Sequence, residues 1–331
     1  GLVGFGTNLV MAQADPEGSR KTLAALDFFV HGDLFMTPTA ELADIVLPIA
    51  SCFEREALRI GFEIDEAAQS LVQFRHAIVP PPGEARSDTD VVFDLAVRLG
   101  LGADFWDGDV EAAYRQQLAP SGIGIEQLRA APEGIRVPLA TRHRKHADPD
   151  AKGNPKGFAT RSRKVELWSE EFLDHGHGAL PDFAEPALGP VARPDLASRF
   201  PLVLTCAKPS LFCQTQHRAL PSLRKRAPHP EVELHPATAA ARGIAAGAWV
   251  RVETPRGAMR VRARLNEALD PRVVVGEHGW WQSCAELGEP GYPMYGAGNA
   301  NFNATVDATV RDPISGTPSH RANLCEVTPA P

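Results

Sequence analysis

The sequence lacks several features that mark particular classes of protein. It has no apolar run near the about 20 residues that a membrane-spanning helix needs, and it has no secretory signal peptide. Positively charged residues are also fewer than negatively charged ones: the chain has 34 Lys and Arg and 41 Asp and Glu, which gives a net charge of −7. A surface that binds nucleic acid needs an excess of basic residues. These absences predict no transmembrane segment and no nucleic-acid partner. They leave the compartment unknown, with the cytoplasm favoured over the periplasm.

Cysteine is scarce, with 5 among 331 residues and neither a CxxC pair nor an even framework, so we expect reduced and mostly buried thiols. The five are Cys52, Cys206, Cys213, Cys284 and Cys325. Two histidine pairs, within residues 143–146 and 175–177, have no cysteine or carboxylate at ligand spacing, so no metal site is predicted. The chain also has no GxSxG, HExxH or P-loop motif, which leaves a serine hydrolase or an NTPase without support.

The composition is that of a globular protein with long loops. Hydrophobic residues make up 44% and charged residues 23%, which is ordinary. Gly and Pro number 28 and 29, which is above the usual share but short of the disordered range, so ordered loops are expected. The first residues, GLVGFGTNLV, have no initiator Met and resemble the middle of a strand–loop unit. We therefore expect the chain to start inside a domain.

The first third of the chain has the pattern of an α/β domain. Apolar runs at residues 26–30 and 45–50 predict two strands, the second buried on both faces, with a short capped helix at 37–41 between them. Asp33 and Asp44 stand at the ends of these strands. In open α/β sheets ligands bind at strand ends, which makes both aspartates candidate site residues, and turn or cap roles are the alternative.

The middle of the chain is less regular. A strand at residues 73–79 is followed by an amphipathic helix at 88–99, which the run DTD at its start is expected to cap. Residues 106–199 are irregular, with one helix candidate at 110–118 and a short strand at 162–168.

From residue 200 the pattern changes to short β segments joined by turns. The predicted strands cover residues 201–205, 231–234, 249–253, 259–263 and 272–275. A hairpin turn is predicted at 254–257, and a single helix is predicted at 236–241. Short strands with turns between them favour a closed β-barrel.

Three loops carry polar residues that suit ligands. GFGTN at residues 4–8 departs from the GxGxxG dinucleotide-binding motif because Leu9 replaces the third glycine. A phosphate-binding turn is the alternative role for these glycines. The loop at 207–218 and the RKR triplet after it are basic, which suits an anion such as a pyrophosphate or else a solvated charged face. The amides of residues 299–305 suit the polar edge of a heterocycle, or else form turns.

Four blocks of sequence, in this order and spacing, resemble the C-terminal half of the dimethyl sulfoxide reductase family of molybdopterin oxidoreductases. They are GTNLV; GDLFMTPTAELADIVLP followed by FERE; PPGEARSD before a helix that ends LAVRLG; and a barrel with VELHPATAAARGIAAGAWVRVETPRG, GWW and NFNATVDATVRDPISG. The resemblance covers essentially the whole chain and implies an α/β fold class. It implies part of a Rossmann-like guanosine-binding α/β domain at 1–105, an irregular connecting region at 106–199, and a cofactor-binding β-barrel of the double-psi type at 200–331.

The cofactor implied by this resemblance is molybdenum or tungsten held by two molybdopterin guanine dinucleotides (bis-MGD). Asp33 is expected to accept hydrogen bonds from guanine with Gly32 beside it, while Arg55 and Asp88 complete the nucleotide site. The other cofactor-binding residues that the resemblance implies are Asn8, Lys208, Gln216, His217, Arg218, Asn303 and Arg321. Lys208 stands where relatives often have arginine, so this contact lacks the fork of a guanidinium.

The resemblance implies no catalytic residue and no metal ligand in this chain. In the family, the cysteines of a [4Fe–4S] cluster and the Cys, selenocysteine or Ser ligand of molybdenum lie in the N-terminal half. Asp44 is expected to cap a strand. His278, Trp280 and Trp281 are expected either to border the cofactor or, for the tryptophans, to pack in the core.

The resemblance therefore predicts a C-terminal fragment, or a separately encoded half, of the catalytic subunit of a molybdenum-dependent oxidoreductase. Such a subunit supports oxygen-atom transfer or two-electron redox chemistry. The expected partners are the missing N-terminal half and, as a candidate, an electron-transfer subunit. One alternative is a non-catalytic module that stores or delivers the dinucleotide. Another is a nicotinamide-dependent dehydrogenase built on residues 1–105, against which the glycine pattern counts.

Overall fold

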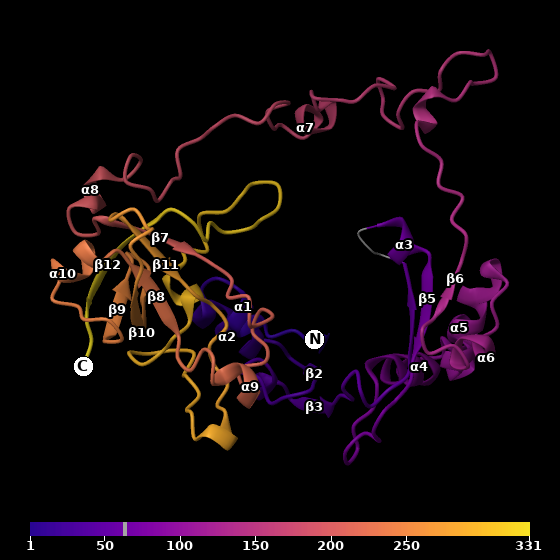
Figure 1. The fold of residues 1–331 in the computed structure, drawn as a ribbon, viewed down its shortest axis with the longest axis horizontal. Helices are drawn as coiled ribbons and strands as arrows, with labels where there is room; N and C mark the ends of the chain where they lie inside the picture. The colour runs from indigo at the N-terminus through magenta and orange to yellow at the C-terminus, as the bar shows by residue number, and fades with distance from the viewer. Residues whose placement is uncertain (62–64) are drawn as a thin grey trace. The chain divides into compact units, whose positions relative to one another are not determined.

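The computed structural model describes residues 1–61 and 65–331 and contains two compact units (Figure 1). The first unit comprises residues 1–49 and 185–331, and the second comprises residues 50–184. The three predicted domains divide the chain differently, because residues 1–49 pack with the C-terminal part of the chain rather than with the residues that follow them.

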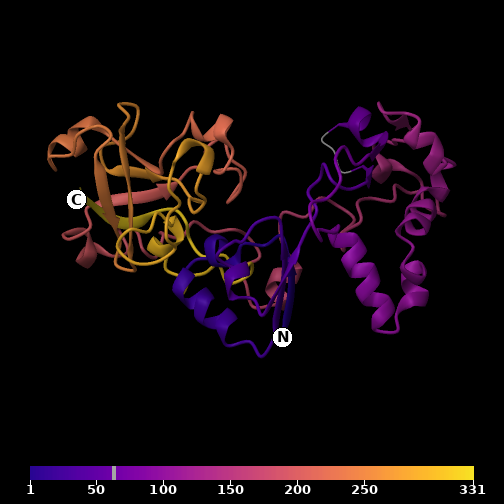
Figure 2. The same ribbon diagram turned by 90° about the horizontal axis from the view of Figure 1, so that it is seen from below.

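A parallel sheet with the strand order β1-β2-β3 opens the first unit. Its elements are β1 (Leu2–Phe5), α1 (Leu9–Ala12), α2 (Pro16–Ala24), β2 (Phe29–Asp33), η1 (Ala40–Leu42) and β3 (Ile45–Pro48). Val10, Met11, Leu23 and Phe29 are buried together beside the sheet. The α/β character predicted for this part of the chain is confirmed, and Figure 2 shows α1 and α2, in indigo, beside the barrel of the same unit.

Asp44 has the structural role that the sequence predicts. Its Oδ2 accepts a hydrogen bond from the backbone N–H of Phe29 at 2.7 Å, which ties the start of β2 to the start of β3. The prediction that β3 is buried on both faces is wrong, because Ile45 is 45% exposed. The reason is that β3 lies at the edge of this sheet, where it pairs with β2 alone among the described strands.

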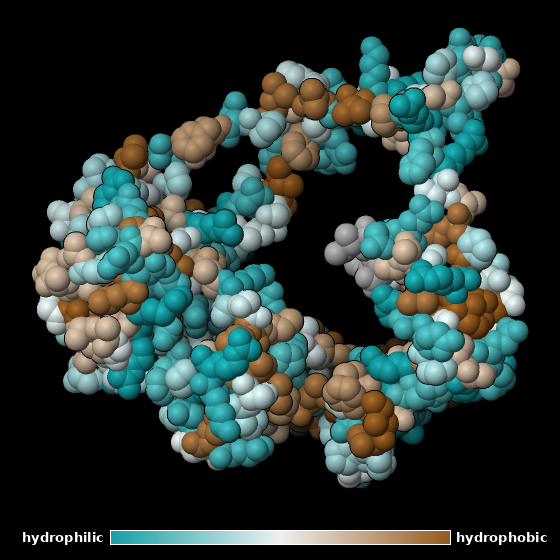
Figure 3. Space-filling view, in the orientation of Figure 1, coloured by the Kyte–Doolittle hydropathy of each residue, from teal (hydrophilic) through white to brown (hydrophobic). Residues whose placement is uncertain are grey.

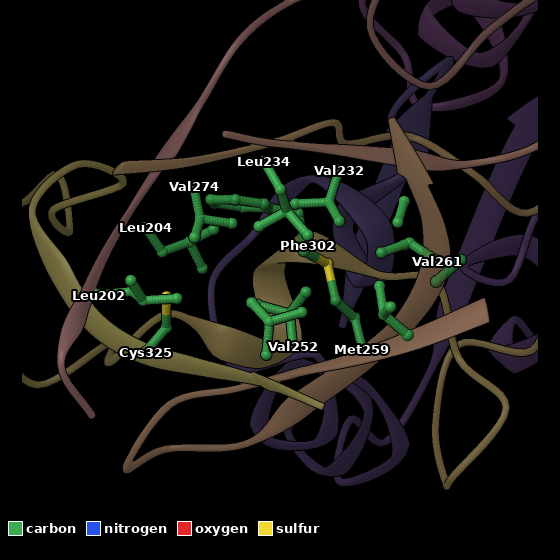
Figure 4. Close-up of a cluster of buried hydrophobic side chains, with 14 of the residues drawn as sticks. Leu202, Leu204, Val232, Leu234, Val252, Met259, Val261, Val274, Phe302 and Cys325 are labelled. Atoms are coloured by element: carbon green, nitrogen blue, oxygen red, sulfur yellow. The ribbon is translucent and has the colours of Figure 1, made fainter. Parts of the chain in front are cut away.

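The C-terminal part of the first unit is a closed six-stranded β-barrel with the order β10-β8-β11-β7-β12-β9. Its strands are β7 (Leu202–Cys206), β8 (Glu231–Leu234), β9 (Trp249–Glu253), β10 (Ala258–Leu265), β11 (Val273–Gly276) and β12 (Asn323–Pro329). Alternate side chains of these strands fill the interior, where Leu204, Val232, Val252 and Val274 are each 0% exposed (Figure 4). The barrel prediction is confirmed, and β12 is a strand that the sequence pattern did not reveal.

Short helices surround the barrel. They are α8 (Pro194–Ala197), α9 (Pro221–Arg224), α10 (Pro236–Ala240), η5 (Ala285–Leu287) and η6 (Phe302–Thr305). The helix predicted at 236–241 matches α10. The predicted hairpin turn joins β9 to β10, and in it the backbone N–H of Thr254 donates to the carbonyl of Gly257 at 2.8 Å.

The second unit contains an antiparallel sheet with the order β4-β5-β6 and several helices. Its elements are β4 (Ala57–Ile60), α3 (Glu66–Gln69), β5 (Leu71–Arg75), α4 (Asp88–Arg98), η2 (Gly102–Gly108), α5 (Val110–Leu118), η3 (Ala119–Ser121), α6 (Ile125–Arg129), β6 (Ile135–Arg136), η4 (Lys145–Ala147) and α7 (Glu170–Asp174). The helix predicted at 110–118 coincides with α5. The cap of α4 is Ser87 rather than the DTD run, because the Ser87 hydroxyl accepts from the N–H of Asp90 at 3.0 Å.

Two further predictions fail, one for residues 162–168 of this unit and one for the cysteines of both units. Residues 162–168 form no strand, and Val165 and Leu167 are 64% and 83% exposed because no neighbouring strand covers them. The thiols are less buried than expected, since Cys52 and Cys213 are exposed. Apolar residues reach the surface in several places, brown in Figure 3. Among the described residues, no helix combines the length and the apolar composition that a membrane crossing requires.

Candidate cofactor-binding site

Five of the predicted site residues line one pocket of about 810 Å³ in the first unit. These five are Asn8, Lys208, Gln216, Asn303 and Arg321. They come from the turn after β1, the loop after β7, η6 and the segment before β12, which are far apart in the sequence. The wall also contains Thr7, Gln214, His278, Ser319 and His320. We call this cavity the cationic pocket, because its described lining includes Lys208 and Arg321 but no carboxylate.

The turn after β1 supplies Asn8. Gly6 has φ +59°, a left-handed conformation that glycine adopts without strain, and it turns the chain towards α1. Asn8 is 8% exposed, and its Oδ1 accepts a hydrogen bond from the hydroxyl of Thr39 at 3.1 Å. Its Nδ2 has no hydrogen-bond partner among the described residues although it is buried. A buried donor without a partner is unfavourable, so the wall presents an unused N–H₂ group at this point.

The loop between β7 and α9 is held by Arg218. Gln214 and His217 have φ of +51° and +76°, which is strained for residues with a side chain. The buried guanidinium of Arg218 donates to the carbonyls of Gln214, Gln216 and His278, at 3.0 Å for Gln216 and 2.7 Å for His278. Burial lowers the pKa of Arg218 to about 10, which keeps it charged at neutral pH. The buried guanidinium of Arg218 therefore holds the strained loop in place through these hydrogen bonds.

Arg218 and His217, both predicted to bind cofactor, do not line the cationic pocket. Arg218 is 0% exposed and lies over the ring of Phe212, with its guanidinium carbon 4.4 Å from the ring centroid. His217 is exposed elsewhere on the loop. Direct cofactor contact by these two residues stays a prediction, and the structure gives Arg218 the task of shaping the wall.

Asn303 and His320 form a bonded pair in the wall. The Nδ2 of Asn303 donates to the carbonyl of Met11 at 2.8 Å, which leaves its Oδ1 facing His320 Nε2 at 3.0 Å. His320 Nδ1 lies 3.0 Å from the carbonyl of Pro318. Both ring nitrogens face acceptors, so both bonds form together only when the ring carries two hydrogens and a positive charge. The sequence drew attention to Asn303 but not to His320.

The electrostatics of the cationic pocket are one-sided. Among the described residues, neither Lys208 nor Arg321 forms an ion pair with a carboxylate. Burial raises the pKa of the Cys206 thiol in the wall, and the charges of Arg321 and Lys208 partly offset this. Both cations therefore act on the same part of the cavity. An anionic ligand with several polar atoms fits this set of donors, and a pyranopterin with its diphosphate has that chemistry.

His278 lines the cationic pocket as an uncharged imidazole. Its Nε2 lies 3.0 Å from Oε1 of Gln214. Burial, followed by the charges of Arg218, Lys208 and His320, lowers its pKa to about 4. It therefore joins the wall as an uncharged hydrogen-bonding group at neutral pH. Trp280, by contrast, is 0% exposed in the barrel core, and its indole N–H donates to Glu277 at 2.9 Å.

We expect His278 to make stability fall with acidification. A histidine in an unfolded chain has a pKa of about 6.5, so below that pH the unfolded state takes up the proton that the folded state refuses until about pH 4. The stabilisation is complete above about pH 6.5 and is lost between there and about pH 4. The urea midpoint of the wild type should therefore fall further between pH 7.5 and pH 5 than the midpoint of His278→Gln. Parallel falls of the two midpoints would contradict the assignment.

Gly32 and Asp33 lie at the end of β2, in the same unit but outside the lining of the cationic pocket. Asp33 Oδ1 accepts from the N–H of Leu34 at 2.7 Å, and its Oδ2 lies 3.1 Å from Nε2 of His31. The side chain of His31 is fully buried. Sequence reasoning missed His31, although residues two apart on a strand share a face, and His31 stands two before Asp33. Guanine binding by Asp33 stays a prediction.

A side chain at position 32 would crowd its neighbours. A Cβ at this position would lie 2.7 Å from Cδ1 of Phe5 and 2.9 Å from Cδ1 of Ile49. We expect Gly32→Ala to lower the free energy of unfolding by about 1–3 kcal/mol, as overpacking does. Gly298→Ala is the matched control, because the added Cβ would meet its nearest atom at 3.7 Å, an ordinary contact. Equal urea midpoints for the two variants would contradict this account.

Arg55 and Asp88 lie in the second unit, where they meet each other. Arg55 NH1 is 3.0 Å from Oδ1 of Asp88, and the same oxygen accepts from the N–H of Thr89 at 3.0 Å. The Nε of Arg55 is buried without a partner among the described residues. The structure thus brings together two residues that the resemblance places in one nucleotide site. Among the described residues there is no group of three or more His, Cys, Asp or Glu side chains that could hold a metal ion.

Comparisons with known proteins agree with the chemistry of the pocket. Residues 2–98 match the family described as molybdopterin oxidoreductase, and residues 202–324 match the molydopterin dinucleotide binding domain. The chain is 30% identical to acetylene hydratase of Syntrophotalea acetylenica over 322 residues, which cover 96% of this chain and 42% of that protein. It is also 30% identical to dimethyl sulfoxide/trimethylamine N-oxide reductase of Cereibacter sphaeroides over 298 residues, which cover 83% of this chain and 35% of that protein.

A solved structure gives the same result. Acetylene hydratase from Pelobacter acetylenicus superposes with a TM-score of 0.82 and 28% sequence identity, over 99% of this chain and 44% of that chain. The chain thus spans less than half the length of these relatives. With both family matches and these relatives, the chain belongs to the dimethyl sulfoxide reductase family of molybdopterin oxidoreductases.

Proposed function

We propose that this chain binds a molybdopterin guanine dinucleotide in the cationic pocket and forms part of the catalytic subunit of a molybdenum-dependent oxidoreductase. The observation that carries the proposal is the convergence of Asn8, Lys208, Gln216 and Arg321 on one cavity from segments far apart in the sequence. The family resemblance places each of these four residues at the cofactor. A solvated charged face, the alternative for the basic loop, does not account for a cavity whose described lining has no carboxylate.

The residues of the pocket have distinct roles in this proposal. Lys208 and Arg321 attract the anionic part of the ligand. Asn8 and Gln216 offer amide groups to the polar edge of the pterin. Asp33 accepts from a guanine, at the end of a parallel strand where ligands of α/β sheets bind. When bound, the cofactor supplies the redox or oxygen-atom-transfer chemistry, and the residues of this chain bind and orient it.

The reaction itself does not follow from the relatives. Their names describe a hydratase, a dehydroxylase, a nitrate reductase and a formate dehydrogenase, which carry out different reactions. The chain spans less than half of the acetylene hydratase that it matches, so substrate contacts from residues beyond this sequence are part of the proposal. We propose that turnover, metal ligation and any [4Fe–4S] cluster depend on the remainder of a catalytic subunit and on an electron-transfer partner.

The test is cofactor content. The chain is purified from a bacterial host that makes the dinucleotide, and the bound pterin is oxidised to its fluorescent form and counted together with guanine. We expect pterin and guanine in equal amounts, near one of each per chain. Absence of pterin would overturn the proposal. A carrier module is distinguished by activity: when the remainder of a related subunit is supplied, a catalytic half gains dye-linked reductase activity and a carrier does not.

A further inference from the structure

The hydroxyl of Thr39 is buried between the first turn of α1 and the side chain of Asn8. Thr39 is 0% exposed, and its Oγ1 accepts from the N–H of Val10 at 3.0 Å and donates to Oδ1 of Asn8 at 3.1 Å. Asn8 is the N-cap of α1, where an asparagine side chain usually accepts a hydrogen bond from a first-turn N–H. Here Asn8 makes no such bond, because Thr39 supplies the acceptor instead.

This arrangement fixes the orientation of the Asn8 amide. A threonine hydroxyl has one hydrogen to donate, and its oxygen accepts through lone pairs. The Val10 N–H uses a lone pair, so the hydrogen is free for the carbonyl oxygen of Asn8. If the amide turned over, its N–H₂ group would face the hydroxyl, and the hydrogen of Thr39 would lose this acceptor. Thr39 therefore decides which end of the amide faces away from the helix.

The end that faces away is the unpartnered N–H₂ group. Asn8 lines the cationic pocket, its Nδ2 is buried, and this nitrogen has no hydrogen-bond partner among the described residues. The molecule thus holds a donor ready in the wall, where an acceptor from a ligand would complete it. Neighbouring Thr37 does not share this task, because its hydroxyl accepts from the N–H of Ala40 at 3.1 Å in the turn of η1.

We propose that Thr39 is a positioning residue, which orients the amide of Asn8 so that its Nδ2 donates to an acceptor atom of the bound ligand. The ligand group at this point is a carbonyl oxygen, a phosphate oxygen or an unprotonated ring nitrogen, and a group that only donates is excluded. The inference rests on the proposed function and adds to it a direction: the pterin dinucleotide lies with an acceptor against Asn8.

The test compares Thr39→Val, which removes the hydroxyl at nearly constant shape, with Thr39→Ser, which keeps it. The measured quantity is the rate at which pterin leaves the purified chain, followed by the fluorescence of the oxidised product. We expect release from Thr39→Val to be about five- to tenfold faster, the effect of one neutral hydrogen bond, and release from Thr39→Ser to stay near that of the wild type. Wild-type rates for Thr39→Val would overturn the proposal.

A double-mutant cycle separates positioning from a structural role. Asn8→Asp removes the N–H₂ group, so Thr39→Val should add little to its effect if Thr39 acts through Asn8. Additive effects would show that Thr39 acts by another route and would overturn the inference. If Thr39→Val does not fold, the wild type is measured by NMR with and without bound pterin. The side-chain ¹⁵N–¹H₂ signal of Asn8 must then shift when pterin is released, and an unchanged signal would overturn the inference. Wild-type chain that carries no pterin at all defeats the proposed function itself, which is a distinct outcome.

Discussion

Charge reversal at Lys208 or Arg321 is expected to reduce the pterin content of the purified chain by about tenfold to a hundredfold. Each change removes a charge-assisted hydrogen bond of about 1.5–3 kcal/mol and places a carboxylate in a pocket that should hold an anion. Both side chains are exposed, so the barrel should fold as before. Pterin and guanine are counted after release, and circular dichroism reports the fold.

The matched control is Lys225→Glu. Lys225 is an exposed cation of the same unit that does not line the cationic pocket, so its reversal changes the net charge equally. We expect it to leave the pterin content near that of the wild type. Equal losses for all three variants would mean that the overall charge matters and not the pocket. A collapsed circular dichroism spectrum for Lys208→Glu and Arg321→Glu would make these residues structural.

Replacement of Arg218 by alanine is expected to lower the free energy of unfolding by about 3–5 kcal/mol. The change removes a buried guanidinium and leaves the carbonyls of Gln214, Gln216 and His278 without their donor. It also removes the packing of this group against the rings of Phe212 and Trp280. Urea unfolding followed by tryptophan fluorescence measures the loss.

The same variant should also lose pterin, because the loop that Arg218 holds supplies part of the wall of the cationic pocket. Arg226→Ala removes an exposed arginine from the segment that follows and should change the free energy of unfolding by less than about 0.5 kcal/mol. If Arg218→Ala unfolds at the same urea concentration as Arg226→Ala, the internal role assigned to Arg218 is wrong.

The barrel could be predicted from the sequence because its strands alternate apolar and polar residues and are separated by turns. The run from Trp249 to Glu253 and the run from Ala258 to Leu265 both follow this rule, and they pair as a hairpin. The strand at Asn323–Pro329 was missed because its partners, β7 and β9, lie more than 70 residues away, and alternation within one segment does not show such pairing. The edge position of β3 was hidden for the same reason.

The pocket could be predicted in part. The sequence gives the chemistry of a side chain but not the direction in which it points. Lys208 and Arg321 line the cationic pocket, whereas Arg218 in the same basic loop turns inward to backbone carbonyls. The same limit applies to Asn303, whose amide bonds inside the protein at both ends. The roles of His320 and Thr39 could not be predicted because they depend on contacts with residues distant in the sequence.

The most direct test is a crystal structure of the chain purified with its pterin. The account predicts electron density for the pterin and its phosphates in the cationic pocket, between Lys208 and Arg321, with an acceptor atom within hydrogen-bond distance of Nδ2 of Asn8. Density for the cofactor at another place on the chain, with only solvent between Lys208 and Arg321, would contradict it.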